Sequence, residues 1–258
     1  MADRVRLETD GDVGIIVLDD PPLNLFGREL VDDLMTTIEE AHAAPIRALI
    51  VRAEGEVFTG GADVNAFDGL STEAGDEFFM RLIAVTQRLE DLALPTLASV
   101  HGLCLTAGFE LSLACDMTWA DQSARFGLVE QVVGITPGMG GTQRLVERAG
   151  PARAREFVMS GALYDAATLE RWNVINRVLP DDELEAKSLK FARKLAAGPT
   201  LAHAATKRIV RAAIDEGVRG ADARVGEIVA PLFETEDAQG AIASFLRDGP
   251  GKATFEGK

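Results

Sequence analysis

The sequence has only two cysteines and three histidines among its 258 residues. Cys104 and Cys115 form no CxxC motif, and no histidine-rich spacing accompanies them, so we expect no metal site and two reduced thiols in a core. Reduced thiols are typical of cytosolic proteins, which predicts a cytoplasmic location. No apolar run reaches the length of a membrane span, and the opening residues MADRVRLETDGDV lack the apolar stretch of a signal peptide.

Positive charge is scarce as well. The 26 Lys and Arg residues face 41 Asp and Glu residues, which gives a net charge of −15. A surface of this charge repels a phosphate backbone, so nucleic acid is not expected as the main partner. A local basic pocket for an anionic ligand stays possible, because net charge does not describe a single site.

Several catalytic and nucleotide-binding motifs are absent. The chain contains neither GxSxG nor HExxH nor a P-loop, which disfavours the usual serine hydrolases, zincins and P-loop enzymes. Gly138-Met139-Gly140 resembles a nucleotide loop, yet Gln143 stands where a dinucleotide fingerprint has its third glycine. We therefore expect neither a nucleotide cofactor nor a metal.

What the chain does have is an alternation of strand and helix patterns. We expect strands at 13–19, 47–53 and 96–102, short strands in DMTWAD and ARFG, and helices at 27–43, 73–93 and 108–115. Helical patterns dominate after residue 183, with boundaries at Gly198-Pro199 and Gly217. The fold class is therefore α/β, followed by a mostly helical C-terminal part.

Glu110 lies in the apolar run HGLCLTAGFELSLACDM. In a helix it would share a face with Leu113, Ala114 and Met117, the face expected to be buried. An ionised carboxylate taken out of water costs several kcal/mol unless it is paired or protonated. Two interpretations stay open: Glu110 reaches solvent or a structural partner at the edge of a core, or it is buried for a function.

Two further segments combine glycines with acidic residues. In EVFTGGADVNAF, Gly60-Gly61 permits either a plain turn or the close approach of backbone amides to a ligand. In RFGLVEQVVGITPG, Glu130 is flanked by valines rather than charges. Two glutamates in apolar settings suit acid–base chemistry, because burial can keep one carboxyl protonated near neutral pH.

The motifs together resemble the crotonase superfamily, and in particular its enoyl-CoA hydratases. The resemblance covers nearly the whole chain and rests on PPLNLF, FTGGADVNAF, HGLCLTAGFELSLACDM, ARFGLVEQVVGITPGMGGTQRL, GPTLAHAATK and GKATFEGK. It implies an α/β spiral of ββα units over residues 1–195. It further implies that residues 196–258 form a helical oligomerisation region with a CoA-covering tail, in a trimer that often pairs into a hexamer.

The resemblance also implies roles for individual residues. The backbone amides of Ala62 and Ala107 match the two oxyanion-hole donors, each worth about 3 kcal/mol in other such sites. Glu110 and Glu130 match the glutamates that hold a water and exchange protons with it and with the α-carbon. Gly138 matches a position whose amide supports the same water-binding corner.

Coenzyme A is part of the substrate in this family, so no separate cofactor is implied. The matching CoA contacts are the main chain of Leu23, Asn24, Leu25, Asp63 and Val64, together with the side chain of Lys252, which can reach the nucleotide phosphates from a neighbouring subunit.

The chain departs from the family pattern at three positions. Thr106-Ala107 stands where consecutive glycines are common, and Val129 where proline is common. These differences add bulk near the oxyanion hole and bear on the placement of Glu130. The acyl tunnel is not defined by the sequence, although Phe67, Phe78, Phe79 and Leu82 are candidates to line it.

Three functions are therefore considered. The first is hydration of a trans-2-enoyl-CoA, which the presence of both glutamates favours. The second is double-bond isomerisation or another lyase reaction on the same scaffold, for which one glutamate often suffices. The third is a non-catalytic oligomer that binds acyl-CoA, which two carboxylates in apolar segments disfavour.

Overall fold

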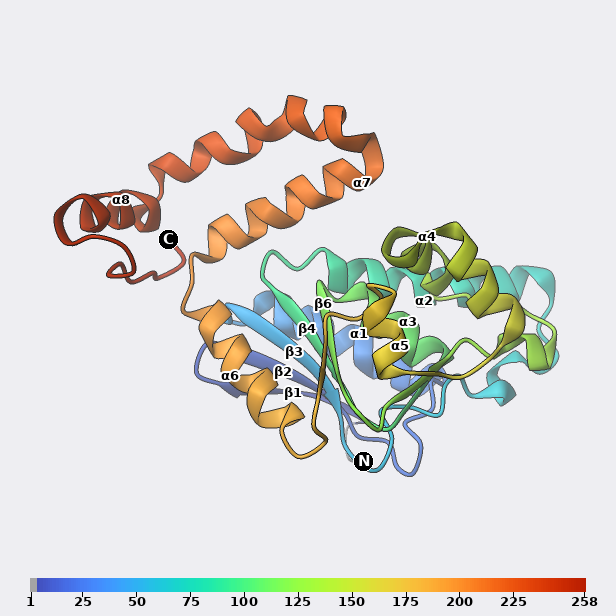
Figure 1. Cartoon of the computed structure of the whole chain (residues 1–258). Coiled ribbons are helices and arrows are strands. Elements are labelled where there is room, and N and C mark those ends of the chain that lie inside the picture. Colours follow the sequence, from blue (N-terminus) through green and yellow to red (C-terminus); the bar gives the residue numbers. More distant parts are fainter. Residues whose placement is uncertain (1–3) are drawn as a thin grey trace.

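The computed structural model describes residues 4–258, which form two β-sheets covered by helices (Figure 1). The main sheet has the strand order β1-β2-β3-β4-β6-β9. Its strands are Val5–Asp10, Val13–Leu18, Ala48–Ala53, Thr96–Val100, Met117–Asp121 and Arg177–Leu179. Strands β1 and β2 pair antiparallel, and every later neighbour pairs parallel. A smaller sheet, β5-β7-β8, consists of Leu103–Leu105, Arg125–Gly127 and Tyr164–Asp165.

Helices connect the parallel strands, as parallel pairing requires. The α-helices α1 to α8 span Arg28–Ala43, Thr72–Glu90, Thr106–Ala114, Gly141–Ser160, Ala166–Arg171, Leu184–Ala196, Thr200–Val229 and Glu236–Asp248. The 3-10 helices η1 to η3 span Val64–Phe67, Glu130–Val133 and Ala230–Glu234. Apolar residues repeat at helical spacing in α1 and are buried there, which explains why this segment packs on the sheet.

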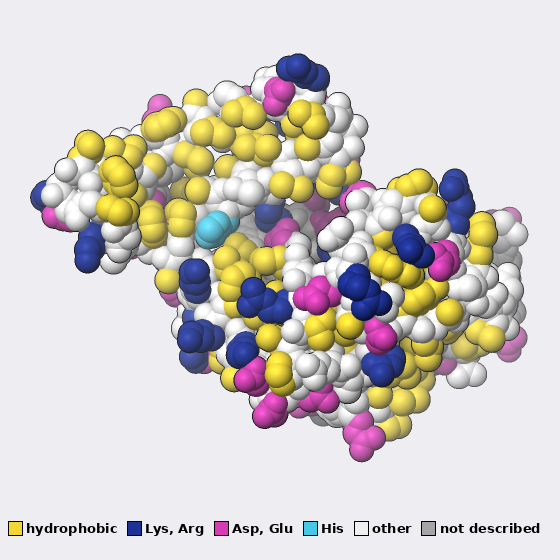
Figure 2. Space-filling view, viewed as in Figure 1, with side chains coloured by type: hydrophobic (Ala, Val, Ile, Leu, Met, Phe, Trp, Pro, Cys, Tyr) yellow, Lys and Arg dark blue, Asp and Glu magenta, His cyan; other side chains and the backbone are white. Residues whose placement is uncertain are grey.

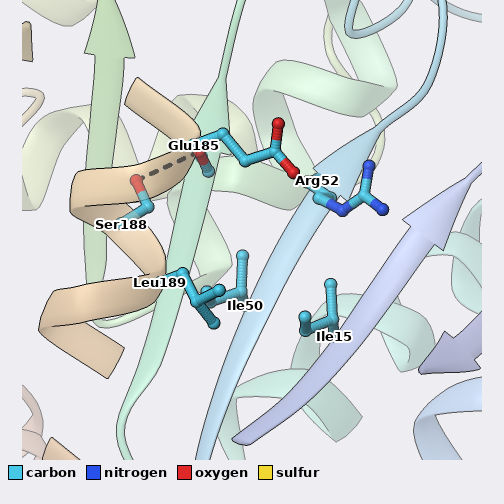
Figure 3. Close-up of a pocket in the computed structure, with 7 residues that line it drawn as sticks. Ile15, Ile50, Arg52, Glu185, Ser188 and Leu189 are labelled. Atoms are coloured by element: carbon cyan, nitrogen blue, oxygen red, sulfur yellow. Dashed lines mark hydrogen bonds between the residues drawn. The ribbon is translucent and has the colours of Figure 1, made fainter. Parts of the chain in front are cut away.

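The two faces of the main sheet bury different helices. Leu49 and Val51 of β3 point into the large core that includes α1, whereas Ala48 and Ile50 pack against α6. A small cavity lies under α6, and the close-up shows its lining side chains (Figure 3). Among them, Ser99 Oγ donates to Ser188 Oγ at 3.1 Å. Helix α6 therefore covers the face of the sheet that is turned away from α1.

The predicted strands and long helices are confirmed within a few residues. The short elements β5, β8, β9 and α5 were not predicted, and two further points need correction. Strand β1 was not predicted, because most of its residues are only partly buried and its pattern is weak. The helix expected at 108–115 runs from Thr106 to Ala114 and is buried on every side, and Met117 begins β6. Glu110 therefore shares no helix face with Met117.

The C-terminal part is helical, as predicted, and α7 bends at Gly217, whose φ is +73°. Helices α7 and α8 extend from the body of the molecule as an arm (Figure 1). Apolar side chains gather on this arm, and a hollow lies between it and the body (Figure 2). Among the residues from 4 onward, no helix combines the length and apolarity needed to cross a membrane. Cys104 and Cys115 are buried and free, as expected.

One partly buried arginine ties α4 to the elements around it. Arg148 Nη1 donates to the carbonyl of Val174, and Nη2 donates to the carbonyls of Leu113 and Cys115, each at 2.8 Å. These carbonyls lie at the end of α3 and in the turn before β9. The side chain therefore provides donors for three backbone acceptors that no longer face water.

We expect Arg148→Ala to lower the free energy of unfolding by about 3 kcal/mol, because three partly buried carbonyls lose their donor. The measurement is urea unfolding followed by circular dichroism. The control is Arg155→Ala at an exposed position of the same helix, expected to change stability by less than about 0.5 kcal/mol. Equal effects of the two variants would contradict this role for Arg148.

Candidate active site

Three loops that follow parallel strands are joined by backbone hydrogen bonds. The Gly60 amide donates to the Leu23 carbonyl at 2.7 Å, and the Leu105 amide donates to the Thr59 carbonyl at 3.2 Å. These bonds bring together the segment after β2, the segment after β3 and the start of α3. The three segments meet at the carboxyl-terminal ends of the strands. This junction brings Ala62 next to the first turn of α3.

Asn24 holds the first two of these loops together. Its φ is +49° and its side chain is buried. The Nδ2 atom lies 3.0 Å from the Glu54 carbonyl and 3.2 Å from those of Val57 and Phe58, and the Asn24 carbonyl accepts from the Thr59 hydroxyl at 2.8 Å. Asn24 therefore braces the loops from inside, and its polar groups are occupied by the protein itself.

The other predicted CoA-contacting residues are more accessible. The side chains of Leu23 and Val64 are 42% and 53% exposed. Asp63 caps η1, since its carboxylate accepts from the Asn65 amide at 3.0 Å. These residues line one rim of the loop junction, and their contacts with CoA stay a prediction.

Lys252 lies in the C-terminal tail, apart from that rim. The tail is held on α8 because the Asp237 carboxylate accepts from the amides of Glu256 and Gly257 at 2.7 and 2.8 Å. Figure 1 shows the tail (dark red) beside α8, on the opposite side of the molecule from α3. The structure of one chain does not bring Lys252, which is exposed, to the other predicted CoA contacts.

Glu110 is buried inside the fold, so its placement at a core edge open to solvent is ruled out. Its side chain is 2% exposed. The Oε2 atom accepts from the Met139 amide at 2.9 Å and from the Gly141 amide at 2.6 Å. Gly141 begins α4, so the carboxyl group lies at a helix N-terminus, where backbone dipoles favour negative charge. A Cβ at Gly141 would lie 2.7 Å from Glu110 Cγ, which explains the glycine.

Burial and hydrogen bonding act on Glu110 in opposite directions. Burial raises its pKa from 4.5 to about 7, and the bonds from the amides of Gly141, Met139 and Gly138, with the charge of Arg144, limit the rise. Gly138 precedes Met139 and Gly141 in the loop, and its part in a water-binding corner stays a prediction. With a pKa of about 7, the Glu110 carboxyl is partly protonated at neutral pH.

Glu130 is the second glutamate of the site. It starts η2 and is 8% exposed. Burial, and then the charge of Glu110, raise its pKa to about 7, which places the two carboxyls within electrostatic reach of each other. Its Oε2 atom is buried and has no hydrogen-bond partner within residues 4–258. A buried carboxylate oxygen without a donor is costly, so this oxygen lacks a partner that its burial calls for.

Of the three valines near Glu130, Val129 is half-buried, but the other two do not form the apolar setting that the sequence indicated. Val132 and Val133 are 78% and 48% exposed, so they point away from the core. Glu130 is instead buried by the fold around η2, which Gln131 ties to the end of α4 by donating from Nε2 to the Ser160 carbonyl at 2.6 Å.

The loop before α4 donates to Glu110 from its Met139 amide. Several residues that support this loop were not found by sequence analysis. The Thr86 hydroxyl of α2 donates to the Met139 carbonyl at 3.2 Å. Arg144 bonds both carboxylate oxygens of Glu90, at 2.8 and 2.5 Å, and the Gly140 carbonyl at 3.1 Å. The contacts of Thr86 with Met139 and of Arg144 with Glu90 join residues 53 and 54 positions apart, so no local sequence pattern predicts them.

Phe79 also supports this loop. Its ring lies against Gly138, where a Cβ would come within 2.2 Å of it. Phe79 stacks on Phe67 and meets Phe78 edge to face, with ring centroids 6.1 and 5.7 Å apart. The aromatic residues predicted to line an acyl tunnel therefore form one cluster beside the loop before α4.

The two predicted oxyanion donors have different surroundings. The Ala107 amide lies in the first turn of α3, where helix geometry supplies no carbonyl partner. The Ala62 amide donates to the Thr106 hydroxyl at 2.8 Å. Thr106 itself has a φ of +44°. The described residues thus include two buried carboxyls whose pKa values lie at about 7 and amides at a helix N-terminus. Groups of this kind suit acid–base chemistry, and their catalytic roles stay a prediction.

Comparisons with known proteins agree with this class. The family model for enoyl-CoA hydratase/isomerase matches residues 8–257. The 2,3-dehydroadipyl-CoA hydratase of Escherichia coli is 32% identical over 83% of this chain and 85% of its own length. The short-chain-enoyl-CoA hydratase of Clostridium acetobutylicum is 30% identical over 94% of each chain.

The structure is also similar to solved ones. An enoyl-CoA hydratase subunit from Geobacillus kaustophilus superposes with a TM-score of 0.92 at 32% identity, covering 99% of this chain and 98% of that one. The chain therefore belongs to the enoyl-CoA hydratase/isomerase family. Its fold is the crotonase fold, α/β with a helical C-terminal region, as the resemblance predicted.

We expect Glu110→Gln to change how stability depends on pH. Between about pH 4.5 and pH 7 the unfolded chain releases the Glu110 proton while the folded protein keeps it, so wild-type stability falls as pH rises. The glutamine variant has no ionisable group at position 110, so its stability does not fall for this reason. It should match the wild type near pH 4 and exceed it by about 3 kcal/mol at pH 8 in urea unfolding.

The control for this experiment is Glu40→Gln, at an exposed position of α1, whose curve should run parallel to that of the wild type. If Glu110→Gln also gives a parallel curve, the raised pKa of Glu110 is wrong.

Proposed function

We propose that the protein is an enoyl-CoA hydratase, which adds water reversibly to the double bond of a trans-2-enoyl-CoA to give a 3-hydroxyacyl-CoA. The observation that carries this proposal is the pair Glu110 and Glu130, two neighbouring buried carboxyls whose pKa values both lie at about 7. At neutral pH such a coupled pair holds one proton between its members. One base and one acid are what a hydration requires.

In the proposed mechanism, a water molecule bound between the two carboxyls attacks the β-carbon. The ionised carboxylate takes a proton from that water, and the protonated carboxyl delivers its proton to the α-carbon. The electron pair of the double bond passes through an enolate whose charge rests on the thioester oxygen. The amides of Ala107 and Ala62 stabilise this charge, and it returns to the α-carbon as the proton arrives.

The substrate carries its own CoA, so the proposed reaction uses no further cofactor and no metal. The rim formed by Leu23, Leu25, Asp63 and Val64 supports CoA binding beside the oxyanion donors. Lys252, on the far side of one chain, fits the proposal only when it belongs to a neighbouring subunit. The free, buried thiols of Cys104 and Cys115 support a cytoplasmic location.

We further propose that the α7–α8 arm associates with other copies of the chain, as a trimer or a pair of trimers. Large apolar side chains are exposed on α8, including Phe245 at 59% and Leu246 at 80%. Apolar surface gathered in this way is typical of an interface (Figure 2). We take residues 196–258 as the region that carries this association.

The proposed reaction predicts loss of turnover in Glu110→Gln and in Glu130→Gln. Each variant should lose at least about 100-fold in kcat, because each lacks a group that must gain or release a proton. The measurement is the loss of conjugated enoyl-thioester absorbance with short and long trans-2-enoyl-CoA substrates. Glu40→Gln serves as the control.

The outcomes separate the three candidate functions. Turnover that survives Glu130→Gln favours an isomerase or another lyase with one acid–base group. Binding of acyl-CoA without turnover of any thioester favours a non-catalytic role.

Association predicts a mass several times that of one chain, measured by light scattering after gel filtration. The double variant Phe245→Glu/Leu246→Glu should lower this mass, because charge replaces apolar contact. The control is Lys194→Glu, an exposed position of α6, which should leave the mass as it is. A monomeric wild type contradicts the proposal.

A further inference from the structure

Thr106 has an unusual backbone conformation for its residue type. Its φ of +44° lies in the left-handed region, which β-branched residues seldom adopt, and only two other non-glycine residues in the part of the chain that the structure describes share it. The side chain is 7% exposed and starts α3, directly before Ala107. Surrounding contacts must therefore hold this conformation in place.

Those contacts come from the loop that carries Ala62. The Thr106 Oγ1 atom accepts the hydrogen bond of the Ala62 amide at 2.8 Å. Gly61, with a φ of +102°, leaves room for it, because a Cβ at that position would lie 2.4 Å from Oγ1. The hydroxyl thus occupies the place in front of the Ala62 amide where a substrate oxygen would otherwise lie.

A threonine hydroxyl can accept one hydrogen bond and still donate another. Oγ1 accepts from Ala62, and within residues 4–258 no acceptor is found for its own proton. The χ1 angle of a β-branched residue is stiff, so the hydroxyl does not swing aside freely. Its proton is therefore available beside the free amide of Ala107.

We propose that the Thr106 hydroxyl is a donor of the oxyanion hole, so that the Ala62 amide acts on the thioester oxygen through it. This inference rests on the proposed function and refines the role of Ala62. The hydroxyl proton stays on Oγ1 throughout: the Ala62 amide polarises the hydroxyl, which donates to the thioester oxygen next to the Ala107 amide. Thr106 then acts as a catalytic residue, because its side chain touches the reacting thioester oxygen.

The test uses butyryl-CoA labelled with ¹³C at its thioester carbonyl, a saturated thioester that cannot be hydrated. Infrared difference spectra report the carbonyl stretch of the bound ligand, which shifts to lower wavenumber as donors polarise it. We expect a clear downshift on the wild type, most of it on Thr106→Ser and a clearly smaller one on Thr106→Val. Thr36→Val, at an exposed position of α1, should behave as the wild type.

Turnover provides the second measurement. Thr106→Val should lose about 100-fold in kcat with little change in KM, and Thr106→Ser should recover most of it. If Thr106→Val does not fold, as judged by circular dichroism, Thr106→Ala removes the hydroxyl with a smaller side chain and takes its place in both measurements.

The outcomes distinguish this inference from the proposed function. A downshift that needs the hydroxyl, in a protein that hydrates no enoyl-CoA, supports the inference and overturns the hydratase proposal. A downshift that is equal or larger in Thr106→Val overturns the inference, because the Ala62 amide then reaches the oxygen directly. A loss of kcat without any change in the carbonyl stretch also overturns it, since Thr106 would then be only structural.

Discussion

The site depends on the hydrogen bonds that the amides of Met139 and Gly141 donate to the Glu110 carboxyl. A carboxyl buried in a helix that is itself enclosed by the core must find donors, and the N-terminus of α4 supplies them. This contact fixes α3 against α4 and requires glycine at position 141. The loop between β7 and α4 is in turn held by Thr86, Phe79 and the pair of Arg144 with Glu90.

Two opposing effects give the site its chemistry. Burial raises the pKa of Glu110, whereas the loop amides and the charge of Arg144 lower it. Their balance leaves its pKa at about 7, and Glu130 reaches the same value by burial and by the charge of its neighbour. Proton exchange near neutrality is therefore a property of how α3, η2 and α4 pack, and no single residue provides it.

Local sequence patterns predicted the features that depend on a short stretch of the chain. Glu110 in an apolar run and Gly60-Gly61 after a strand were both recognisable, and the α/β order followed from periodicity. Contacts between distant segments were not predictable in this way. The hydrogen bond between Ala62 and Thr106 joins residues 44 apart in sequence, and the true surroundings of Glu130 arise from tertiary packing and not from the adjacent valines.

Burial of α3 on every side bears on how this protein can change in evolution. All residues of Thr106–Ala114 are enclosed, so almost any larger side chain there disturbs the core as well as the site. Exposed positions such as Val132 and Val133 meet no such limit. Substitutions that the fold tolerates should therefore accumulate first at such exposed positions, while α3 changes slowly because its packing constrains every residue in it.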